Sequence, residues 1–418
     1  MSGYDDNINY LRNKLTQKSV RVNTRYRYYE MKNFTRDLGI SSPPSLKNWQ
    51  TSLGWCAKAV DSLADRLVFR EFDDDYLNFN AIFNMNNPDI FFDSAILSAL
   101  ISSCCFVYIS ADADGYPRLQ VIDGANATGI MDPITGMLTE GYAVLERDRD
   151  TGSPLTEAYF TPKETVIIRK GEAVPESWEN VTGYPLLIPI VYRPDAKREF
   201  GHSRITRAAM SYAGSAIRTI KRSEIAAEYF SVPQRWATGV SEDVEDIDKW
   251  RASMSTLLTF TKDEDGDSPT LGSFTQQSMS PHTEQLRTFA SLFAGEVGLT
   301  LDDLGFTTEN PSSAEAIKSS HETLRLTARK AQRTFGSGFL NVGFVAACLR
   351  DKYQYLRRQA YNEKPLWEPI FEPDMSTLSL IGDGAIKINQ AIPGYFDAEN
   401  LRNLTGIDAG KGAGELNG

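Results

Sequence analysis

The densest group of potential metal ligands in the sequence is the run Asp73, Asp74 and Asp75, with Asp61 and Asp65 shortly before it. In two-metal nucleases and phosphotransferases such carboxylates hold the Mg²⁺ ions that stabilise the attacking and leaving oxygens. Adjacent side chains of a regular element point in different directions, however, so the three aspartates cannot all converge on one ion. We therefore interpret the run as a solvated acidic turn, and a metal-dependent nuclease built on it is the weaker alternative.

The other residue types that commonly do chemistry form no recognisable motif. His202, His282 and His321 show neither an HExxH pattern nor metal-ligand spacing. The sequence contains no G-x-S-x-G nucleophile elbow and no GxxxxGK[ST] phosphate-binding loop. Four cysteines lack zinc spacing and indicate reduced thiols in a cytosolic setting: Cys56, Cys104, Cys105 and Cys348. We expect no catalytic residue, no metal and no cofactor, and a protein that is not an enzyme.

The charge balance limits the possible nucleic-acid functions. The chain of 418 residues has a net charge of −11, whereas a protein that holds DNA by its phosphates is usually basic. This balance argues against tight DNA binding, but it suits a surface that DNA passes without sticking. Serines and paired cysteines interrupt the longest apolar run, residues 95–109, so no membrane span is predicted. The N-terminal residues show no secretory signal.

The elements that could position a site begin with helices and continue with strands. Residues 1–45 form a polar arm, whose basic, tyrosine-rich patch at 21–27 could touch nucleic acid or another subunit. Apolar residues step by threes and fours through 46–67 and predict an amphipathic helix; a second helix is expected at 88–103. Short β-type runs between turn clusters fill 106–191 and predict a mostly antiparallel sheet, which gives an α+β fold class.

Long helices follow this sheet. One is predicted at 205–227, and Ser280-Pro281 begins another that reaches Val297. Between them, residues 239–267 carry nine acidic side chains and three basic ones, which suits solvated surface or a module that faces a partner. A loop-like segment then leads to about residue 310.

The longest helical pattern follows this loop. Ser312 can cap the helix, and Glu315 can reach back to the cap. A cationic stripe lies beside an apolar one, with a basic residue at every fourth position: His321, Arg325, Arg329 and Arg333. We expect the helix to reach about residue 358, with a kink at Gly336 and Gly338. Prolines then punctuate a return, a short helix is expected at 397–404, and the glycine-rich tail is expected to be flexible.

This order of elements resembles the portal proteins of tailed bacteriophages, of the long-tailed siphophage type. Three local motifs carry the resemblance: Arg193-Pro-Asp with Gly201-His-Ser before a helix, Asn310-Pro-Ser-Ser-Ala-Glu-Ala-Ile-Lys at the start of the long helix, and Trp367-Glu-Pro with Ala385-Ile-Lys. The resemblance covers nearly the whole chain as an arrangement. It implies a ring of about twelve copies at one capsid vertex, through which DNA is packaged and ejected.

The resemblance also implies a division of the chain into the parts of a portal subunit. These are a wing at 1–200, a stem helix at 201–231, a clip at 232–279, a second stem helix at 280–297, a tunnel loop at 298–312, a long kinked helix at 313–360, a wing return at 361–388, and a short crown with a flexible tail at 389–418.

Three sets of site residues follow from this division. The tunnel loop would contribute Asp302, Asp303, Thr307, Thr308 and Asn310. The long helix would contact DNA or the acidic groups of a neighbouring subunit through Lys318, Arg325, Arg329 and Arg333. The clip would present Glu242, Asp243, Glu245 and Asp246 to partners.

The implied partners are the terminase large subunit, a head–tail adaptor, the major capsid and scaffolding proteins, and double-stranded DNA that passes without sequence specificity. The implied location is the portal vertex of the virion, after assembly in the bacterial host cytoplasm and without a membrane. Besides the nuclease, one further alternative stays open: a monomeric adaptor whose acidic 239–267 segment binds a basic partner.

Overall fold

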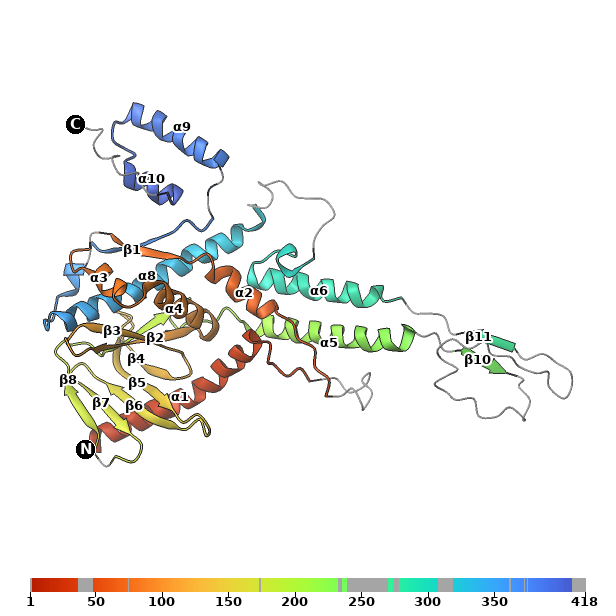
Figure 1. Cartoon of the computed structure of the whole chain (residues 1–418), viewed down its shortest axis with the longest axis horizontal. Helices are drawn as coiled ribbons and strands as arrows, with labels where there is room; N and C mark the ends of the chain where they lie inside the picture. Colours follow the sequence, from red (N-terminus) through yellow and green to blue (C-terminus); the bar gives the residue numbers. More distant parts are fainter. Residues whose placement is uncertain are drawn as a thin grey trace.

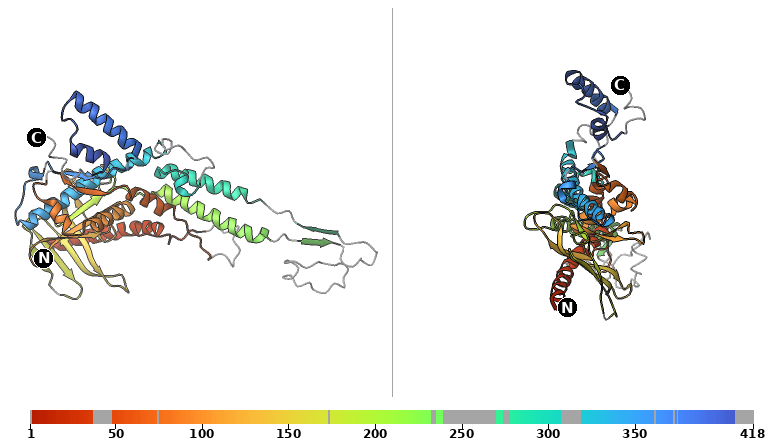
Figure 2. Two further views of the ribbon diagram at one scale, coloured as in Figure 1. Left: turned by 45° about the horizontal axis from the view of Figure 1, so that its top comes forward. Right: turned by 90° about the vertical axis from the view of Figure 1, so that its left-hand side faces the viewer.

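The computed structural model describes residues 2–36, 48–73, 75–172, 174–231, 235–238, 270–273, 278–306, 319–360, 362–371, 373 and 375–407. Helices and strands form a body, from which two long helices, α5 (Arg207–Ser231) and α6 (Ser280–Val297), project to one side (Figure 1). A pair of shorter helices, α9 (Met375–Ala391) and α10 (Ala398–Thr405), lies on a different side of the body, and the two views of Figure 2 agree with this arrangement. The α+β fold class expected from the sequence is confirmed.

The strands of the body pair in antiparallel ladders. β2 (Cys104–Ala111) lies between β3 (Pro117–Ile122) and β9 (Leu187–Val191), with Phe106 opposite both Ile122 and Pro189. A five-stranded sheet follows the chain in order: β4 (Ala127–Met131), β5 (Leu138–Arg147), β6 (Pro154–Phe160), β7 (Glu164–Arg169) and β8 (Glu176–Glu179). The antiparallel region predicted at 106–191 is therefore confirmed, although the sequence pattern did not indicate β4 and β8.

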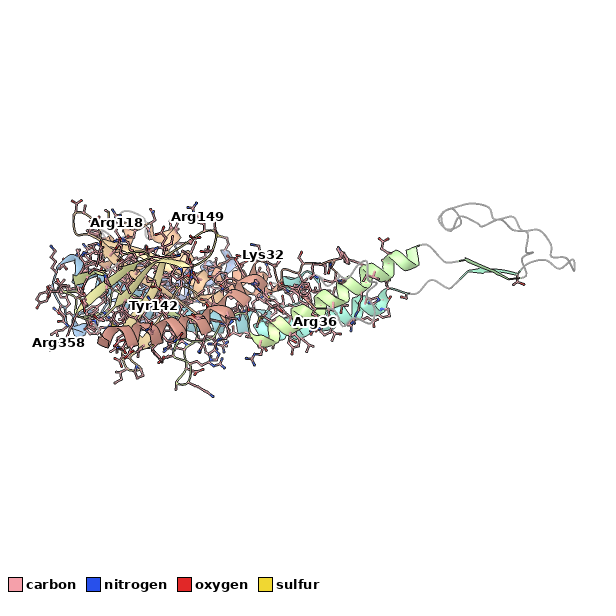
Figure 3. All side chains as sticks on the ribbon, turned by 90° about the horizontal axis from the view of Figure 1, so that it is seen from below. Lys32, Arg36, Arg118, Tyr142, Arg149 and Arg358 are labelled. Atoms are coloured by element: carbon pink, nitrogen blue, oxygen red, sulfur yellow. The ribbon has the colours of Figure 1, made fainter. Side chains whose placement is uncertain are left out.

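The first helix, α1 (Ser2–Tyr29), corrects the expectation of a polar arm at 1–45. Its buried residues recur at helical spacing: Ile8, Leu11, Leu15 and Val22. Ile8, Leu11 and Leu15 pack on the five-stranded sheet, next to Tyr142, which is labelled in Figure 3. At the same place Arg12 donates to Glu157, which also accepts a hydrogen bond from the Tyr142 hydroxyl. The arm looked polar because this apolar stripe is narrow and the rest of the helix faces solvent.

The next helices match the sequence pattern in part. α2 (Trp55–Ala64) is much shorter than the helix expected at 46–67, because residues 48–54 are not helical and Gly54 directly precedes its first turn. Glycine disfavours helix continuation by its backbone entropy. α3 (Phe79–Asn84) is short, and α4 (Pro88–Ser102), with proline in its first turn, confirms the helix expected at 88–103.

The central helix of the body is α8 (Glu322–Arg350), which packs on β9, β2 and α3. It starts later than the expected cap at Ser312, which lies outside the described residues. It also ends before the expected residue 358: Lys352 adopts a left-handed φ of 49°, which terminates helices, and the 3₁₀ turn η4 (Arg357–Ala360) follows.

Two glycines expected to kink this helix have a different role. α8 is helical without interruption through Gly336 and Gly338. A Cβ atom at Gly336 would lie 2.6 Å from Cγ of Pro365, and one at Gly338 would lie 2.8 Å from Cδ1 of Ile190. The absence of a side chain at these glycines therefore lets the strands β12 (Lys364–Trp367) and β9 lie close to the helix. Glycine is common at sites where two backbones approach each other closely.

The projecting pair confirms two predicted helices. α5 (Arg207–Ser231) and α6 (Ser280–Val297) lie side by side (Figures 1 and 2). Beyond them, β10 (Arg235–Thr238) pairs with β11 (Thr270–Ser273). The acidic segment at 239–267 lies outside the described residues.

The chain returns to the body before its last two helices. β12 (Lys364–Trp367) pairs with β1 (Phe69–Asp73), which places both segments beside α8. α9 (Met375–Ala391) then crosses position 388, where the sequence analysis set the boundary between wing return and crown. α10 (Ala398–Thr405), capped by Asp397, confirms the short helix expected at 397–404.

The return segment contains a buried acid with a testable consequence. Glu363 is 3 % exposed and accepts a hydrogen bond from the backbone N–H of Leu77, and burial raises its pKa from 4.5 to about 7. The folded protein therefore holds this proton more tightly than the unfolded chain, so the resulting stability is complete below pH 4.5 and is lost as the pH rises through 7.

Glu363→Gln should accordingly remove a pH-dependent loss of stability. The wild type should be less stable at pH 8 than at pH 5 by on the order of 1–2 kcal/mol from this group, and the amide variant should lack that component. Urea unfolding at both pH values measures the difference. An unchanged pH dependence in Glu363→Gln would show that the carboxyl ionises freely in the folded protein.

Candidate channel-loop site

The loop expected at 298–312 starts from a fixed turn at the end of α6. Gly298 adopts a left-handed φ of 68°, and its N–H bonds to the carbonyl of Ala294, which ends the helix. A Cβ at Gly298 would lie 2.9 Å from Cγ2 of Thr323 in α8. The end of α6 is therefore in close contact with the start of α8.

The next residues fold on themselves and form the short 3₁₀ helix η3 (Asp302–Leu304). Oδ2 of Asp303 accepts hydrogen bonds from both the N–H and the hydroxyl of Thr300, each at 2.9 Å. The Thr300 hydroxyl in turn accepts from the N–H of Asp303 at 3.2 Å. This reciprocal pattern is that of a capping box, and Gly305, with φ of 88°, ends the turn.

The base of the loop is anchored by apolar contacts. The ring of Phe306 lies 6.4 Å from the ring of Trp55 in α2, edge to face, and the Trp55 ring also contacts Phe293 of α6. Leu301 and Leu304 are partly buried against the same core. Residues 298–306 are therefore a packed base, which the sequence analysis had included in the loop itself.

Asp303 and His321, which lie on either side of residues 307–318 in the sequence, are close together in the structure. Nδ1 of His321, the residue that precedes α8, lies 3.7 Å from Oδ2 of Asp303. The His321 ring stacks on Phe371, over which the guanidinium of Arg66 lies at 5.2 Å. The structure thus brings together Asp303 and His321, which the sequence analysis assigned to separate features.

The cationic stripe of α8 divides into one paired and two exposed members. Arg325 forms two hydrogen bonds of 2.7 Å with the carboxylate of Glu322, which lowers the pKa of Glu322. Arg329 and Arg333 are exposed, and neither forms an ion pair with the residues that the structure describes. The stripe is therefore available to a partner mainly through these two residues.

A buried arginine beneath the loop base was missed in the sequence. Arg204 is 6 % exposed; its Nε donates to the carbonyl of Ala59 in α2 at 3.1 Å, and Nη2 donates to the carbonyl of Val297, the last residue of α6. Burial lowers its pKa. Arg204 satisfies a carbonyl that the helix end leaves free, and it joins α6 to α2. In the sequence, the only feature that distinguishes Arg204 is its position directly after the Gly201-His-Ser motif.

Several predicted site residues lie outside the described part of the chain. They are Thr307, Thr308, Asn310, Lys318, Glu242, Asp243, Glu245 and Asp246. Of the predicted tunnel-loop residues, Asp302 is exposed on η3 and Asp303 is held by Thr300. The structure therefore places Asp302 and Asp303 in the packed base formed by residues 298–306.

The aspartate run does not form a metal centre in the described part of the chain. Asp75 accepts hydrogen bonds from the N–H groups of Phe79 and Asn80 and so caps α3. Asp61 accepts from the Tyr29 hydroxyl at 2.9 Å. Asp74 lies outside the described residues, and within them no group of three or more potential ligands is placed to hold an ion. No described helix has the length and apolar character needed to cross a membrane.

These elements can be compared with known proteins. A family model described as "Phage portal protein, SPP1 Gp6-like" matches residues 8–360, which span the body, the projecting helices and α8. The chain belongs to this phage portal protein family. The recognition made from the sequence is confirmed, and a portal protein is a structural component of a phage particle rather than an enzyme.

Individual relatives agree with this assignment. The portal protein of Mycobacterium phage L5 is 23% identical over 334 residues, which cover 75% of this chain and 68% of the relative. The portal protein of Mycobacterium phage D29 is 24% identical over 344 residues, with coverages of 77% and 70%.

Solved structures show distant similarity. A chain in the neck of a native gene transfer agent particle, computed with C12 symmetry, has a TM-score of 0.45 and 13% identity, and the match covers 85% of this portal protein and 90% of that chain. A chain in the virion of the native gene transfer agent gives a TM-score of 0.45 and 12% identity, with coverages of 93% and 100%.

Proposed function

We propose that this portal protein assembles as a closed ring of twelve copies at one capsid vertex and that double-stranded DNA passes through its channel. The observation that carries the proposal is the exposed pair α5 and α6, which projects from the body and is covered by it only at its base (Figure 1). Leu292 on α6 is 46 % exposed. A heterologous contact between such pairs can close into a ring and cover these faces.

The proposed division into parts uses these elements. The body, residues 1–200 with the return strand β12, would be the wing, and α5 and α6 would be the stem. Residues 232–279, of which β10 and β11 are described, would be the clip, and α8 would support the tunnel loop. We place the start of the crown at Met375 rather than at residue 389, because α9 is one helix across that boundary.

The proposed tunnel loop lies within residues 298–312 and includes Thr307, Thr308 and Asn310, while Lys318 belongs to the proposed long helix at 313–360. Asp303 and His321, on either side of these residues, lie 3.7 Å apart and support the loop from its base. Asp302 would stand at the mouth of the loop. Arg329 and Arg333 would then pair with acidic groups of a neighbouring copy, or secondarily touch passing DNA.

The remaining partners are proposed from position and charge. The acidic clip, with Glu242, Asp243, Glu245 and Asp246, would meet the terminase large subunit during packaging and the head–tail adaptor afterwards. The wing would contact the major capsid and scaffolding proteins. Assembly would take place in the host cytoplasm. An acidic ring suits the passage of DNA without sequence specificity, since it resists tight phosphate binding.

Replacing residues 307–312 with a glycine–serine linker of equal length tests the loop assignment. Ring assembly should be unchanged, because the packed base at 298–306 is retained, while packaging or retention of DNA should fall at least about tenfold, since ordered contacts to the duplex are lost. Filled and empty particles counted from a complemented phage lacking its own portal give the measurement. Wild-type packaging by intact variant rings would contradict the assignment.

A deletion that also removes 301–306 is a useful comparison. It takes away Leu301, Leu304 and Phe306, which pack on the core, and should destabilise the subunit itself. Loss of packaging in that variant would therefore report folding, whereas the linker variant reports the loop.

A further inference from the structure

A basic groove of about 830 Å³ lies where α1 meets the segment that leads into α5. We define the basic groove by the eight cations that line it: Lys14, Lys18, Arg21, Arg25, Arg193, Lys197, Arg198 and Arg207. Only two carboxylates, Glu199 and Glu296, line it as well, and Glu296 accepts a hydrogen bond from Thr206 at 2.7 Å. In a chain of net charge −11, this concentration of positive charge is exceptional.

The groove cations are held by neutral groups. Lys14 donates to the carbonyl of Gly129 at 2.8 Å, and Arg25 donates to the carbonyl of Ser102 at 3.1 Å. Lys18 lies over the ring of Phe200. None of the eight forms an ion pair with a residue that the structure describes. Burial lowers the pKa values of Lys14 and Arg25; Glu199 opposes this shift at Lys14, whereas the neighbouring cations Lys18 and Arg21 add to it at Lys14 and Arg25 respectively.

The same level of the molecule carries an acidic edge, which we define by the exposed residues Asp65 and Asp302 together with Glu322, whose carboxylate is already paired with Arg325. Contacts connect these positions: η3 contacts α2, and Asp303 of η3 lies 3.7 Å from His321, next to Glu322. No residue of α2, η3 or α8 lines the groove. In Figures 1 and 2, α1 lies on the lower side of the body and the start of α8 on the upper side.

We propose that the basic groove of one copy receives the acidic edge of the neighbouring copy. This inference rests on the proposed ring. A ring of identical subunits needs two different, complementary patches at one level of each copy, and the two patches meet that requirement in charge and in position. Their attraction would also favour the correct neighbour over a reversed one, since reversal would place like charges together.

Protein carboxylates fit the groove better than the phosphates of a DNA duplex. Lys14, Lys18 and Arg25 are partly buried, so an anion must enter the groove to reach them. Side chains on a loop or short helix such as η3 can do so, whereas a duplex is a stiff, convex rod. The acidic surface outside the groove would also repel an approaching duplex.

The test uses full-length protein with sets of exposed residues. One variant reverses the groove (Arg21→Glu, Arg193→Glu, Lys197→Glu and Arg198→Glu), which leaves four cations against six carboxylates. A second variant reverses the edge (Asp65→Lys with Asp302→Lys), and a third is the control. The control, Arg149→Glu with Arg358→Glu, changes exposed arginines outside the groove; Figure 3 shows Arg149 at the edge of the body opposite to α1. Native mass spectrometry at increasing concentration and at two salt concentrations measures the fraction of rings.

The groove and edge variants should each need at least about tenfold more protein to assemble, which corresponds to about 1.4 kcal/mol per contact. The control should assemble like the wild type, and high salt should weaken wild-type assembly. The decisive result is the equimolar mixture: groove-reversed and edge-reversed copies should restore rings together, because every contact in an alternating ring is again attractive.

Other outcomes separate the possibilities. If the wild type forms no ring, the proposed function fails. If the wild type and both variants form rings equally well, or if the mixture does not recover, this inference alone is overturned. If the groove variant assembles normally but loses salt-sensitive binding of a DNA duplex, the groove is a nucleic-acid surface and the proposal is wrong.

Discussion

Arg204→Ala should lower the free energy of unfolding by about 3 kcal/mol, because it leaves the carbonyl of Val297 without its donor, removes a second hydrogen bond to Ala59 and opens a cavity. The buried guanidinium donates to Ala59 in α2 and to Val297 at the end of α6. It therefore holds α6 against α2. The melting temperature should fall by several degrees, and hydrogen exchange should increase first in the last turn of α6.

Two further variants identify the cause of this loss. Arg204→Met keeps most of the side-chain volume but removes every donor, so it should lose nearly as much stability as Arg204→Ala. Arg149→Ala removes an exposed arginine and should change the melting temperature by less than about 1 °C. A small effect of both Arg204 variants, below about 1 kcal/mol, would mean that water replaces the guanidinium at the two carbonyls.

Gly343→Val should also destabilise the body, by about 3 kcal/mol. Replacing glycine within a helix ordinarily stabilises it, but a Cβ here would lie 2.8 Å from Cγ of Phe79, which is fully buried. Because the interior is close-packed, α3 would have to move away from α8. Equilibrium unfolding in urea gives the size of the loss.

The matched control for this variant lies in α9. No atom other than immediate neighbours lies within 4 Å of a Cβ placed on Gly382, so Gly382→Val should leave stability unchanged or raise it slightly. Equal losses at the two sites would show that the contact with Phe79 does not cause the effect. A stabilising Gly343→Val would contradict the close contact between α3 and α8.

Elements with strong periodicity could be predicted from the sequence. The helices at α4, α5 and α6 and most strands between 104 and 191 lie where the patterns placed them. α1 was missed because its apolar stripe is only one residue wide in most turns and the remaining positions are polar. Hydrophobic pattern detects a buried face best when that face is broad.

The site was harder to predict because its contacts join distant segments. The Thr300-x-x-Asp303 capping box is visible in the sequence, and it could have separated the packed base from the loop. The contact between Asp303 and His321, the close approach at Gly336 and the role of Arg204 depend on tertiary packing. The basic groove combines α1 with residues 193–207, so only its Arg21–Arg25 part was visible as a basic patch.

The central claim is that copies of this portal protein close into a ring around a channel. Negative-stain electron microscopy of the purified full-length protein, with native mass spectrometry of the same sample, tests it most directly. Closed rings with a central opening, with the mass of twelve subunits, are expected. A strict monomer at concentrations of tens of micromolar, in low and moderate salt alike, would contradict the claim.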